Sequence, residues 1–208
     1  MNPYRPGAAL DDIGMATPRQ FATSNVLSRP FQLDANALRD RARQNLGDGA
    51  VTPGYAADRT TVLQLLNTAL ATELVCVLRY KRHQFMAQGI HAKSVAAEFL
   101  EHALEEQGHA DELAARIVQL GGEPDFSPDG LSARSHAEYR TGTDLASMIE
   151  EDLVAERIAI DSYGDMLRYL DDDDPTTRRM IEGILATEEK HADELASLSR
   201  GLGRSAAP

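Results

Sequence analysis

The sequence predicts an all-α protein, namely an antiparallel four-helix bundle with a long connection between its second and third helices and an extended N-terminal arm. Apolar residues recur at helical spacing along four long stretches after residue 57. Residues that start or stop helices bound these stretches. Aromatic residues make up only 5% of the chain and Trp is absent, which suits long helices better than a β-rich fold.

Residues 1–57 are expected to form the arm, because they are rich in Pro and Gly and contain no Glu. One short helix is expected within it, capped by Asp34 and stopped by Gly47. The arm would cover part of the bundle or of a neighbouring subunit. The bundle itself is expected over residues 58–200, followed by a short tail over 201–208.

The first bundle helix is expected over about residues 58–88, where "VLQLLNTALATELVCVL" carries apolar residues at i, i+3, i+4 and i+7 and Gly89 ends the pattern. The second is expected over about residues 92–120, stopping at two consecutive glycines. The next segment, "GGEPDFSPDGLSARSHAEYRTG", is longer than an ordinary loop and is therefore expected to cross the bundle.

The third helix is expected to start at a cap formed by Thr143 or Asp144 and to run to about Leu170. The run of aspartates at 171–174 is interpreted as a solvated loop ending in a helix cap, or otherwise as the lining of an ion entry route. With Pro175 at its first position, the fourth helix is expected to continue to about residue 200.

The hexapeptide HADELA occurs twice, and in each copy a Glu stands three residues before the His. These pairs are Glu106 with His109 and Glu188 with His191. Residues at i and i+3 lie on the same helix face, so each pair can point into the bundle together. One such pair is common on a polar helix, whereas two pairs in matching helices indicate that both contribute to one functional site.

The repeat extends to the first and third helices. Glu73 is followed seven residues later by Tyr80, and Glu156 is followed seven residues later by Tyr163. Both Glu residues stand among apolar residues, where a buried carboxylate is costly unless its charge is compensated. Four carboxylates and two neutral imidazoles around two divalent ions would form a neutral site, and this oxygen-rich donor set favours iron or manganese over structural zinc.

The adjacent residues Glu105 and Glu189 are alternative ligands. A shift of one residue rotates a side chain by about 100° around the helix, so both are expected to face outward. Asp152, four residues before Glu156, is expected either to support a ligand His or to be exposed.

Four segments carry a resemblance to a known family: "ATELVCVLRY", "EEQGHADEL", "EDLVAERIAI" and "TEEKHADEL". With them, residues 58–200 resemble the ferritin-like superfamily, and within it bacterioferritin and the related Dps-like proteins. The resemblance implies that Glu106 and Glu188 bridge two iron ions. It implies one terminal Glu and one His for each ion, drawn from Glu73, Glu156, His109 and His191. It also implies that Tyr80 is an electron donor close to the centre.

Two departures from bacterioferritin change what is expected. Bacterioferritin binds haem through a Met just after its first bridging Glu, and Gln107 stands there, so no haem is expected. The chain also ends soon after the fourth helix, where bacterioferritin adds a short fifth helix. A cage of twelve subunits is therefore expected rather than one of twenty-four.

The implied function is that of a ferroxidase that oxidises Fe(II) with O2 or H2O2 and stores Fe(III) in a hollow cage. One alternative is a non-storing di-metal redox enzyme, such as a peroxidase or a manganese catalase-like protein. A Dps-like DNA-protecting protein ranks lower, because the net charge is −12 and Arg39, Arg41 and Arg43 of the arm are nearly balanced by Asp34, Asp40 and Asp48.

The start of the chain lacks the pattern of a signal peptide and no apolar run approaches a membrane span, so a cytoplasmic protein without a membrane partner is expected. Cys76 is interpreted as a small apolar filler, or otherwise as a redox group near the metals. Tyr163 is interpreted as a core aromatic. The remaining histidines considered, His83, His102 and His136, have no partner at ligand spacing and are expected at the surface.

Overall fold

The structure is a computed structural model that describes residues 32–90 and 92–205, with the side chains of 203–205 excepted. Its four long helices are α2 (Arg59–Met86), α3 (Ala92–Gln119), α5 (Leu145–Leu170) and α6 (Pro175–Ser205). The shorter elements are α1 (Ala35–Ala42), a 3-10 turn at Leu46–Asp48, and α4 (Leu131–Arg134). The chain divides into two units, residues 1–35 and 36–208, and the second contains all four long helices.

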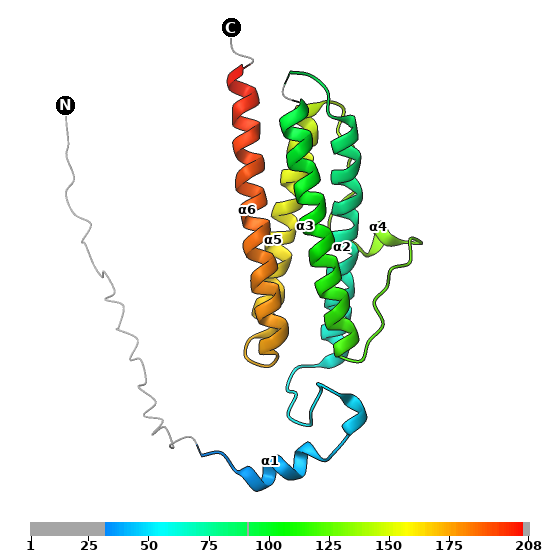
Figure 1. The fold of residues 1–208 in the computed structure, drawn as a ribbon, viewed down its shortest axis with the longest axis vertical. Helices are drawn as coiled ribbons and strands as arrows, with labels where there is room; N and C mark the ends of the chain where they lie inside the picture. Colours follow the sequence, from blue (N-terminus) through cyan, green and yellow to red (C-terminus); the bar gives the residue numbers. More distant parts are fainter. Residues whose placement is uncertain (1–31, 91, 206–208) are drawn as a thin grey trace, which may run out of the picture. The chain divides into compact units, whose positions relative to one another are not determined.

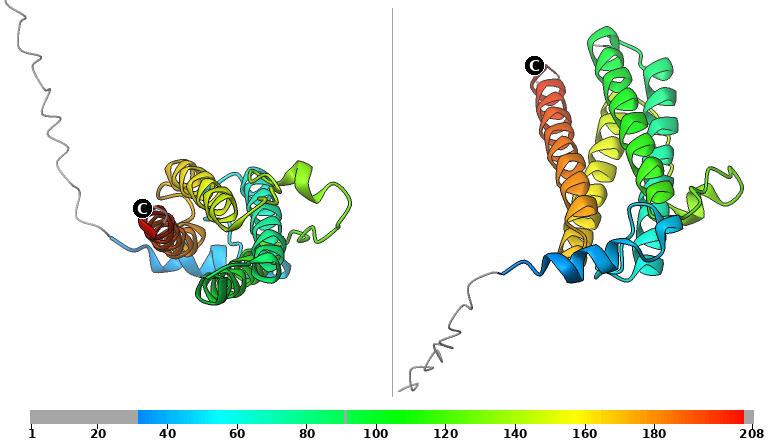
Figure 2. Two further views of the ribbon diagram at one scale, coloured as in Figure 1. Left: turned by 90° about the horizontal axis from the view of Figure 1, so that it is seen from above. Right: turned by 60° about the horizontal axis from the view of Figure 1, so that its bottom comes forward.

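The four long helices form the antiparallel bundle that the sequence predicts. Helix α2 packs mainly against α3, and α5 packs mainly against α6, with further contacts between α2 and α5. Figure 1 shows α3 and α5 running in the same direction, so the connection between them passes from one end of the bundle to the other. Viewed from above, the α2–α3 pair lies beside the α5–α6 pair (Figure 2). The predicted fold class is therefore confirmed.

The helix boundaries follow from local capping chemistry. Asp58 accepts a hydrogen bond from the Thr61 amide at 2.7 Å and begins α2. Asp144, one of the two predicted caps, forms a capping box with Ser147 at the start of α5. The arm helix is shorter than expected, because α1 ends at Ala42 and a separate 3-10 turn follows. The part of the arm before residue 32 lies outside the described residues.

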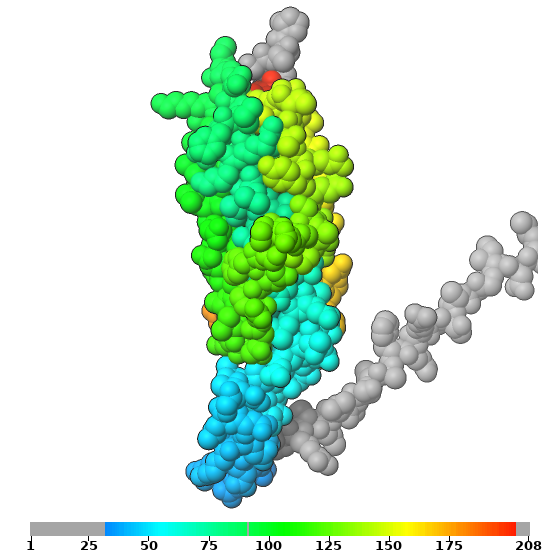
Figure 3. Space-filling model, turned by 90° about the vertical axis from the view of Figure 1, so that its right-hand side faces the viewer, coloured from blue at the N-terminus to red at the C-terminus, as the bar shows by residue number. Residues whose placement is uncertain are grey.

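The connection between α3 and α5 packs across one side of the bundle, where α4 contacts α2 (Figure 3). Arg79 on α2 donates a hydrogen bond to the Glu138 carbonyl of this connection at 3.0 Å. The crossover is therefore attached to α2 at several points, which include the Glu123 carbonyl, the His136 amide and the Glu138 carbonyl.

A buried polar cluster closes the end of the bundle at which α5 is connected to α6. Asp174 caps α6 through the Thr177 amide at 2.9 Å and accepts a hydrogen bond from Arg116 on α3 at 2.8 Å. Tyr55, which precedes α2, donates a further hydrogen bond to Asp174 at 2.7 Å. The other three aspartates of the run are exposed, which matches a solvated loop that ends in a cap.

The core divides into two apolar clusters along the bundle. One includes Leu66, Leu113 and Ile181, and the other includes Phe99, Ile149 and Leu195, all fully buried. By length and composition, α2 is long and apolar enough to span a membrane, contrary to the expectation that no segment is. Half of its most apolar stretch is buried inside the bundle, as is usual for a core helix.

Candidate metal centre

Each of the four long helices places one buried glutamate at the middle of the bundle. Glu73 comes from α2, Glu106 from α3, Glu156 from α5 and Glu188 from α6, and each is only 1% exposed. These carboxylates lie in the interval between the two apolar clusters. Burying an ionised carboxylate without compensation costs several kcal/mol, on the order of the whole stability of a domain when repeated four times.

Two histidines complete this group of acidic residues. His109 follows Glu106 by one turn of α3, and its Nδ1 lies 3.2 Å from Glu106 Oε2 and 2.9 Å from Glu188 Oε1. His191 follows Glu188 by one turn of α6, and its Nδ1 lies 3.5 Å from Glu106 Oε1. Both Glu-x-x-His pairs therefore point into the bundle, as the sequence predicts.

The six side chains fall into two groups whose donor atoms all lie within 4.8 Å of one another. The first group consists of Glu73, Glu106, His109 and Glu188. The second consists of Glu106, Glu156, Glu188 and His191. Glu106 and Glu188 belong to both groups, so two ions seated in these groups would share them. We call the six side chains together the central cluster.

The hydrogen bonding of the central cluster is incomplete. Five of its donor atoms are buried without a hydrogen bond of good geometry: Glu73 Oε2, Glu106 Oε1, Glu156 Oε2, Glu188 Oε1 and His191 Nδ1. The 2.9 Å approach of His109 Nδ1 to Glu188 Oε1 is close but poorly directed. Buried polar atoms are nearly always satisfied in folded proteins, and an orphaned group indicates a strained, catalytic or ion-binding position. The donor set, with carboxylate oxygens and imidazole nitrogens and without thiolate, fits iron or manganese.

The pKa values show how protons balance the charge of the carboxylates in the metal-free protein. Burial, followed by the charge of Glu106, raises the pKa of Glu73 to about 8. Burial and the charges of Glu106 and Glu73 raise the pKa of Glu188 well above its usual value. Burial also disfavours ionisation of Glu106 and Glu156, but hydrogen bonds, chiefly from neighbouring cluster residues, outweigh it and lower both pKa values.

The imidazoles behave in the opposite way to isolated buried histidines. Burial lowers the pKa of both, but interactions with the surrounding carboxylates, first of all Glu106, outweigh it and raise the pKa of His109 and His191 to about 10. Near neutral pH the cluster thus holds protons at the positions where two divalent ions would supply positive charge.

Comparison with known proteins places this arrangement in a family. The model of the ferritin-like domain family matches residues 63–204. The chain belongs to the ferritin-like domain family.

Relatives of this ferritin-like protein include bacterioferritins. The Desulfovibrio desulfuricans bacterioferritin is 28% identical over 155 residues, which cover 72% of this chain and 83% of the relative. The Rhodobacter capsulatus bacterioferritin is 30% identical over 136 residues, covering 64% and 80%. Among solved structures, a dodecameric thioferritin from Bacteroides fragilis, described as bacterioferritin-related, superimposes with a TM-score of 0.70 at 30% identity and covers 72% of this chain and 90% of its own. Dps from Thermosynechococcus elongatus, with a TM-score of 0.65 at 23% identity and coverage of 67% and 90%, shares the fold.

Two tyrosines tie the halves of this ferritin-like bundle together across the central cluster. Tyr80 on α2 donates a hydrogen bond to Glu156 on α5, and Tyr163 on α5 donates one to Glu73 on α2. Both tyrosines are fully buried, and burial raises the pKa of each phenol well above its usual value. Tyr163 is therefore a core aromatic, as interpreted, but it also contacts the cluster as directly as Tyr80 does.

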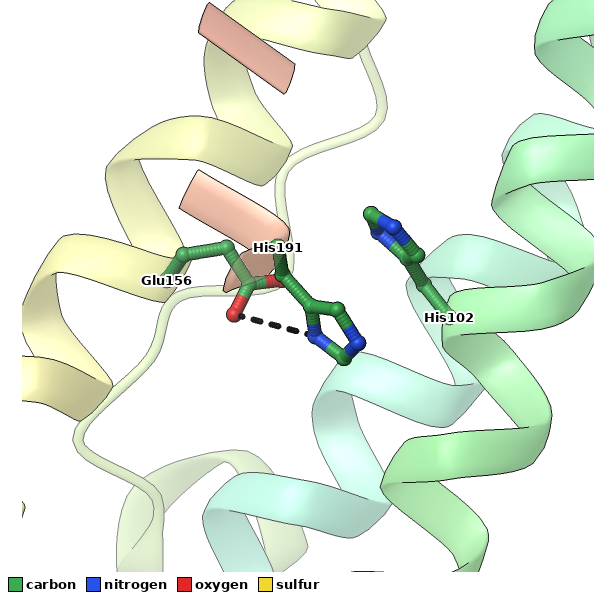
Figure 4. Close-up of side chains that lie close together, drawn as sticks. All are labelled: His102, Glu156 and His191. Carbon is green, nitrogen blue, oxygen red and sulfur yellow. Dashed lines mark ion pairs between the residues drawn. The ribbon is translucent and has the colours of Figure 1, made fainter. Parts of the chain in front are cut away.

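His102 contradicts the sequence interpretation, which placed it at the surface. Its side chain is 0% exposed, and its ring stacks on that of His191 with 4.0 Å between centroids. Its Nδ1 lies 3.2 Å from the Tyr80 hydroxyl. Figure 4 shows the two imidazoles facing each other beside Glu156. Sequence spacing offered one signal that was missed, because Glu98 stands four residues before His102 on α3, whereas the other partners of His102 come from α2 and α6.

His83 is also buried, contrary to expectation, whereas His136 is exposed as expected. The Nδ1 of His83 lies 2.8 Å from Asp152 Oδ2, and Arg79 Nε donates to Asp152 Oδ1 at 2.7 Å. Asp152 is thus neither exposed nor bound to a ligand histidine, the two alternatives that the sequence left open. It joins α5 to α2 through a buried ion pair.

Glu105 is a further correction, because it does not face fully outward. It is partly buried, and its Oε2 pairs with His191 Nε2, the ring nitrogen turned away from the cluster. Such a contact orients a ligand imidazole. Glu189 is exposed, as expected. Cys76 is buried with the Arg79 guanidinium at 3.7 Å, and burial raises the pKa of its thiol, as for a small apolar filler.

Proposed function

We propose that this ferritin-like protein is a ferroxidase, which binds two Fe(II) ions as substrate in the central cluster, oxidises them with O2 or H2O2 and stores the product. The observation that carries this proposal is that two four-residue donor groups share Glu106 and Glu188. Shared carboxylates hold two ions side by side, so that two electrons are available to one oxidant molecule. The remaining residues of the cluster give each ion one further Glu and one His.

Charge supports the same assignment. Four carboxylates and two neutral imidazoles carry a charge of −4, which two divalent ions neutralise. Carboxylate oxygens also stabilise the more highly charged Fe(III) over Fe(II), which favours oxidation of the bound ions. The net charge of −12 over the chain attracts cations to the surface and raises their local concentration.

The tyrosines have defined tasks in this scheme. Tyr80 and Tyr163 each hold one oxygen of a terminal carboxylate, which leaves the other oxygen, Glu156 Oε2 or Glu73 Oε2, facing the ion. The phenol of Tyr80 donates its proton to the hydrogen bond with Glu156, so a proton that leaves Tyr80 together with an electron would have an acceptor nearby. We therefore retain Tyr80 as the proposed electron donor.

Storage and assembly rest on the relatives. A dodecamer is described for the Bacteroides fragilis thioferritin, and we propose a cage of twelve subunits for this chain by similarity. We also propose that the protein binds no haem. Gln107, at the position of the haem-ligating Met, has no thioether and donates a hydrogen bond to Asp111 at 3.0 Å.

A second candidate is a redox enzyme that keeps both metal ions, such as a peroxidase or a manganese catalase-like protein. It is favoured by the near equivalence of the two donor groups, each with three carboxylates and one imidazole. Equal and complete ligand sets suit a cofactor that is retained, whereas a storage centre must release its product.

One experiment separates these functions. The full chain is titrated anaerobically with Fe(II), oxidant is then added, and particle size is measured on the same sample. Anaerobic occupation of the two central positions, then uptake by a large particle far beyond the number of Fe(II) bound before oxidation, supports storage. Uptake that stops at the number bound before oxidation, with continued consumption of peroxide, supports the second candidate. Absence of Fe(II) binding in the bundle contradicts both.

A further inference from the structure

A third group of metal-binding side chains lies outside the central cluster. It consists of Glu98 and His102 on α3 and Glu194 on α6, whose donor atoms all lie within 4.8 Å of one another. The Nε2 of His102 is 3.1 Å from Glu194 Oε2 and 3.7 Å from Glu98 Oε1. The imidazole is fully buried, whereas the two carboxylates are about one-third exposed. We call these three side chains the outer triad.

The hydrogen bonds around His102 determine which of its ring nitrogens carries the proton. The Tyr80 hydroxyl has a single proton, which it donates to the Glu156 carboxylate. Its oxygen can therefore only accept from His102 Nδ1 at 3.2 Å, which makes Nδ1 the protonated nitrogen of the neutral ring. Nε2 is then left with a free lone pair.

This tautomer creates a conflict on the outer side of the ring. The lone pair of Nε2 faces the carboxylate oxygens of Glu194 and Glu98, and none of these atoms has a proton to donate. Two acceptors at 3.1 Å repel each other unless a cation, either a second ring proton or a metal ion, lies between them. A divalent ion bound to Nε2 and the two carboxylates would convert the contact into coordination, with donors that suit Fe(II), Mn(II) or Co(II).

The surroundings of the outer triad allow an ion to arrive. Glu98 and Glu194 line a surface pocket of about 370 Å³ between α3 and α6, together with Ser94 and Ser197. The nearest cation among the described side chains is Lys190, whose Nζ lies 3.7 Å from Glu194 Oε1 and 3.5 Å from Glu105 Oε1. Lys190 thus approaches the far oxygen of Glu194 and leaves Oε2 directed at His102.

We propose that Glu98, His102 and Glu194 form a third divalent-cation site, separate from the central cluster and open to solvent through this pocket. The site lies beside the centre, because His102 also belongs to a group with Glu156 and His191, within the same 4.8 Å limit (Figure 4). One imidazole therefore separates the outer ion from the second ion of the central cluster.

The test uses Co(II) alone as the probe, with the full chain under anaerobic conditions. Equilibrium dialysis with metal analysis gives the number of ions bound per chain. The wild type is expected to bind three Co(II), and the double variant Glu98→Gln/Glu194→Gln is expected to bind two. The matched control Glu112→Gln/Glu182→Gln removes two exposed carboxylates from the same helices, with the same change of charge, and is expected to bind three.

The outcomes distinguish this proposal from the proposed function. Saturation of the wild type at two ions, or three ions retained in Glu98→Gln/Glu194→Gln, overturns the outer site while leaving the central pair intact. Binding of a single ion to the wild type, lost in that variant but kept in the control, supports the outer site. The same result contradicts the central di-metal site, and with it the proposed ferroxidase.

Discussion

Tyr80 on α2 donates a hydrogen bond to Glu156 on α5, across the middle of the bundle. The reciprocal hydrogen bond runs from Tyr163 on α5 to Glu73 on α2. Each half of the repeat thus supplies a tyrosine that positions a carboxylate of the other half. The near-twofold symmetry that the sequence repeat predicts therefore extends to the contacts beside the cluster, but it ends at His102, which contacts Tyr80.

This broken symmetry gives a prediction for the two tyrosines. Tyr80→Phe and Tyr163→Phe each remove a hydrogen bond to a terminal carboxylate, which costs on the order of tenfold in activity. Tyr80→Phe is expected to slow Fe(II) oxidation further, because it also removes the proposed electron donor. Stopped-flow absorbance at two Fe(II) per chain measures both rates. Equal losses in the two variants would assign the whole effect to carboxylate positioning.

The shared carboxylates give a prediction about stoichiometry. Glu188→Gln weakens a ligand common to both ions and is expected to weaken binding of both, whereas Glu73→Gln is expected to weaken only one. Each loss should exceed the roughly 10- to 100-fold typical of residues that merely orient a ligand. Anaerobic Co(II) titration measures the affinities. The exposed neighbour Glu189→Gln is the control, and a loss of the same size there would contradict the assignment.

The elements and the inward-facing residues could be predicted because they depend on local spacing. Apolar periodicity and caps such as Asp144 and Asp174 define the helices, and the i, i+3 rule places each Glu-x-x-His pair on one face. The environment of His102 could not be predicted, since Tyr80 and Glu194 are distant in sequence and meet it only through helix packing. The prediction that Glu105 faces outward was based on the rotation per residue within α3 alone. It was wrong because α6 brings His191 next to the side of α3 that carries Glu105.

The Asp152 ion pair gives a prediction for stability. Asp152→Ala leaves the Arg79 guanidinium, 1% exposed, without its carboxylate partner. Loss of one partner from a buried ion pair costs about 3–5 kcal/mol, so the free energy of unfolding is expected to fall by that amount. Urea denaturation followed by circular dichroism measures it. Asp165→Ala breaks an exposed pair with Arg168 and should cost less than about 1 kcal/mol. A similar loss of unfolding free energy in both variants would show that the buried pair stabilises the fold no more than the exposed pair does.

The raised pKa values predict that the metal-free protein loses stability as pH rises. His109 and His191 titrate near pH 6.5 when unfolded and near pH 10 when folded, and Glu73 moves from 4.5 to about 8. Between these values the folded state binds more protons than the unfolded state, so the contribution of these groups is complete below the unfolded pKa and is lost as pH rises through the folded pKa. The melting temperature in the presence of a chelator should therefore fall from pH 6.5 to pH 10.

Bound metal should oppose this fall in melting temperature, because divalent ions compete with protons for the same donor atoms and bind more tightly as pH rises. Melting curves with excess Mn(II) are thus expected to separate increasingly from the metal-free curves between pH 6.5 and pH 8. The variant His136→Gln, which changes an exposed histidine, should reproduce both wild-type profiles. A metal-free melting temperature that stays level or rises over this range would mean that the folded protein does not hold the extra protons, and that the carboxylates of the central cluster are compensated in another way.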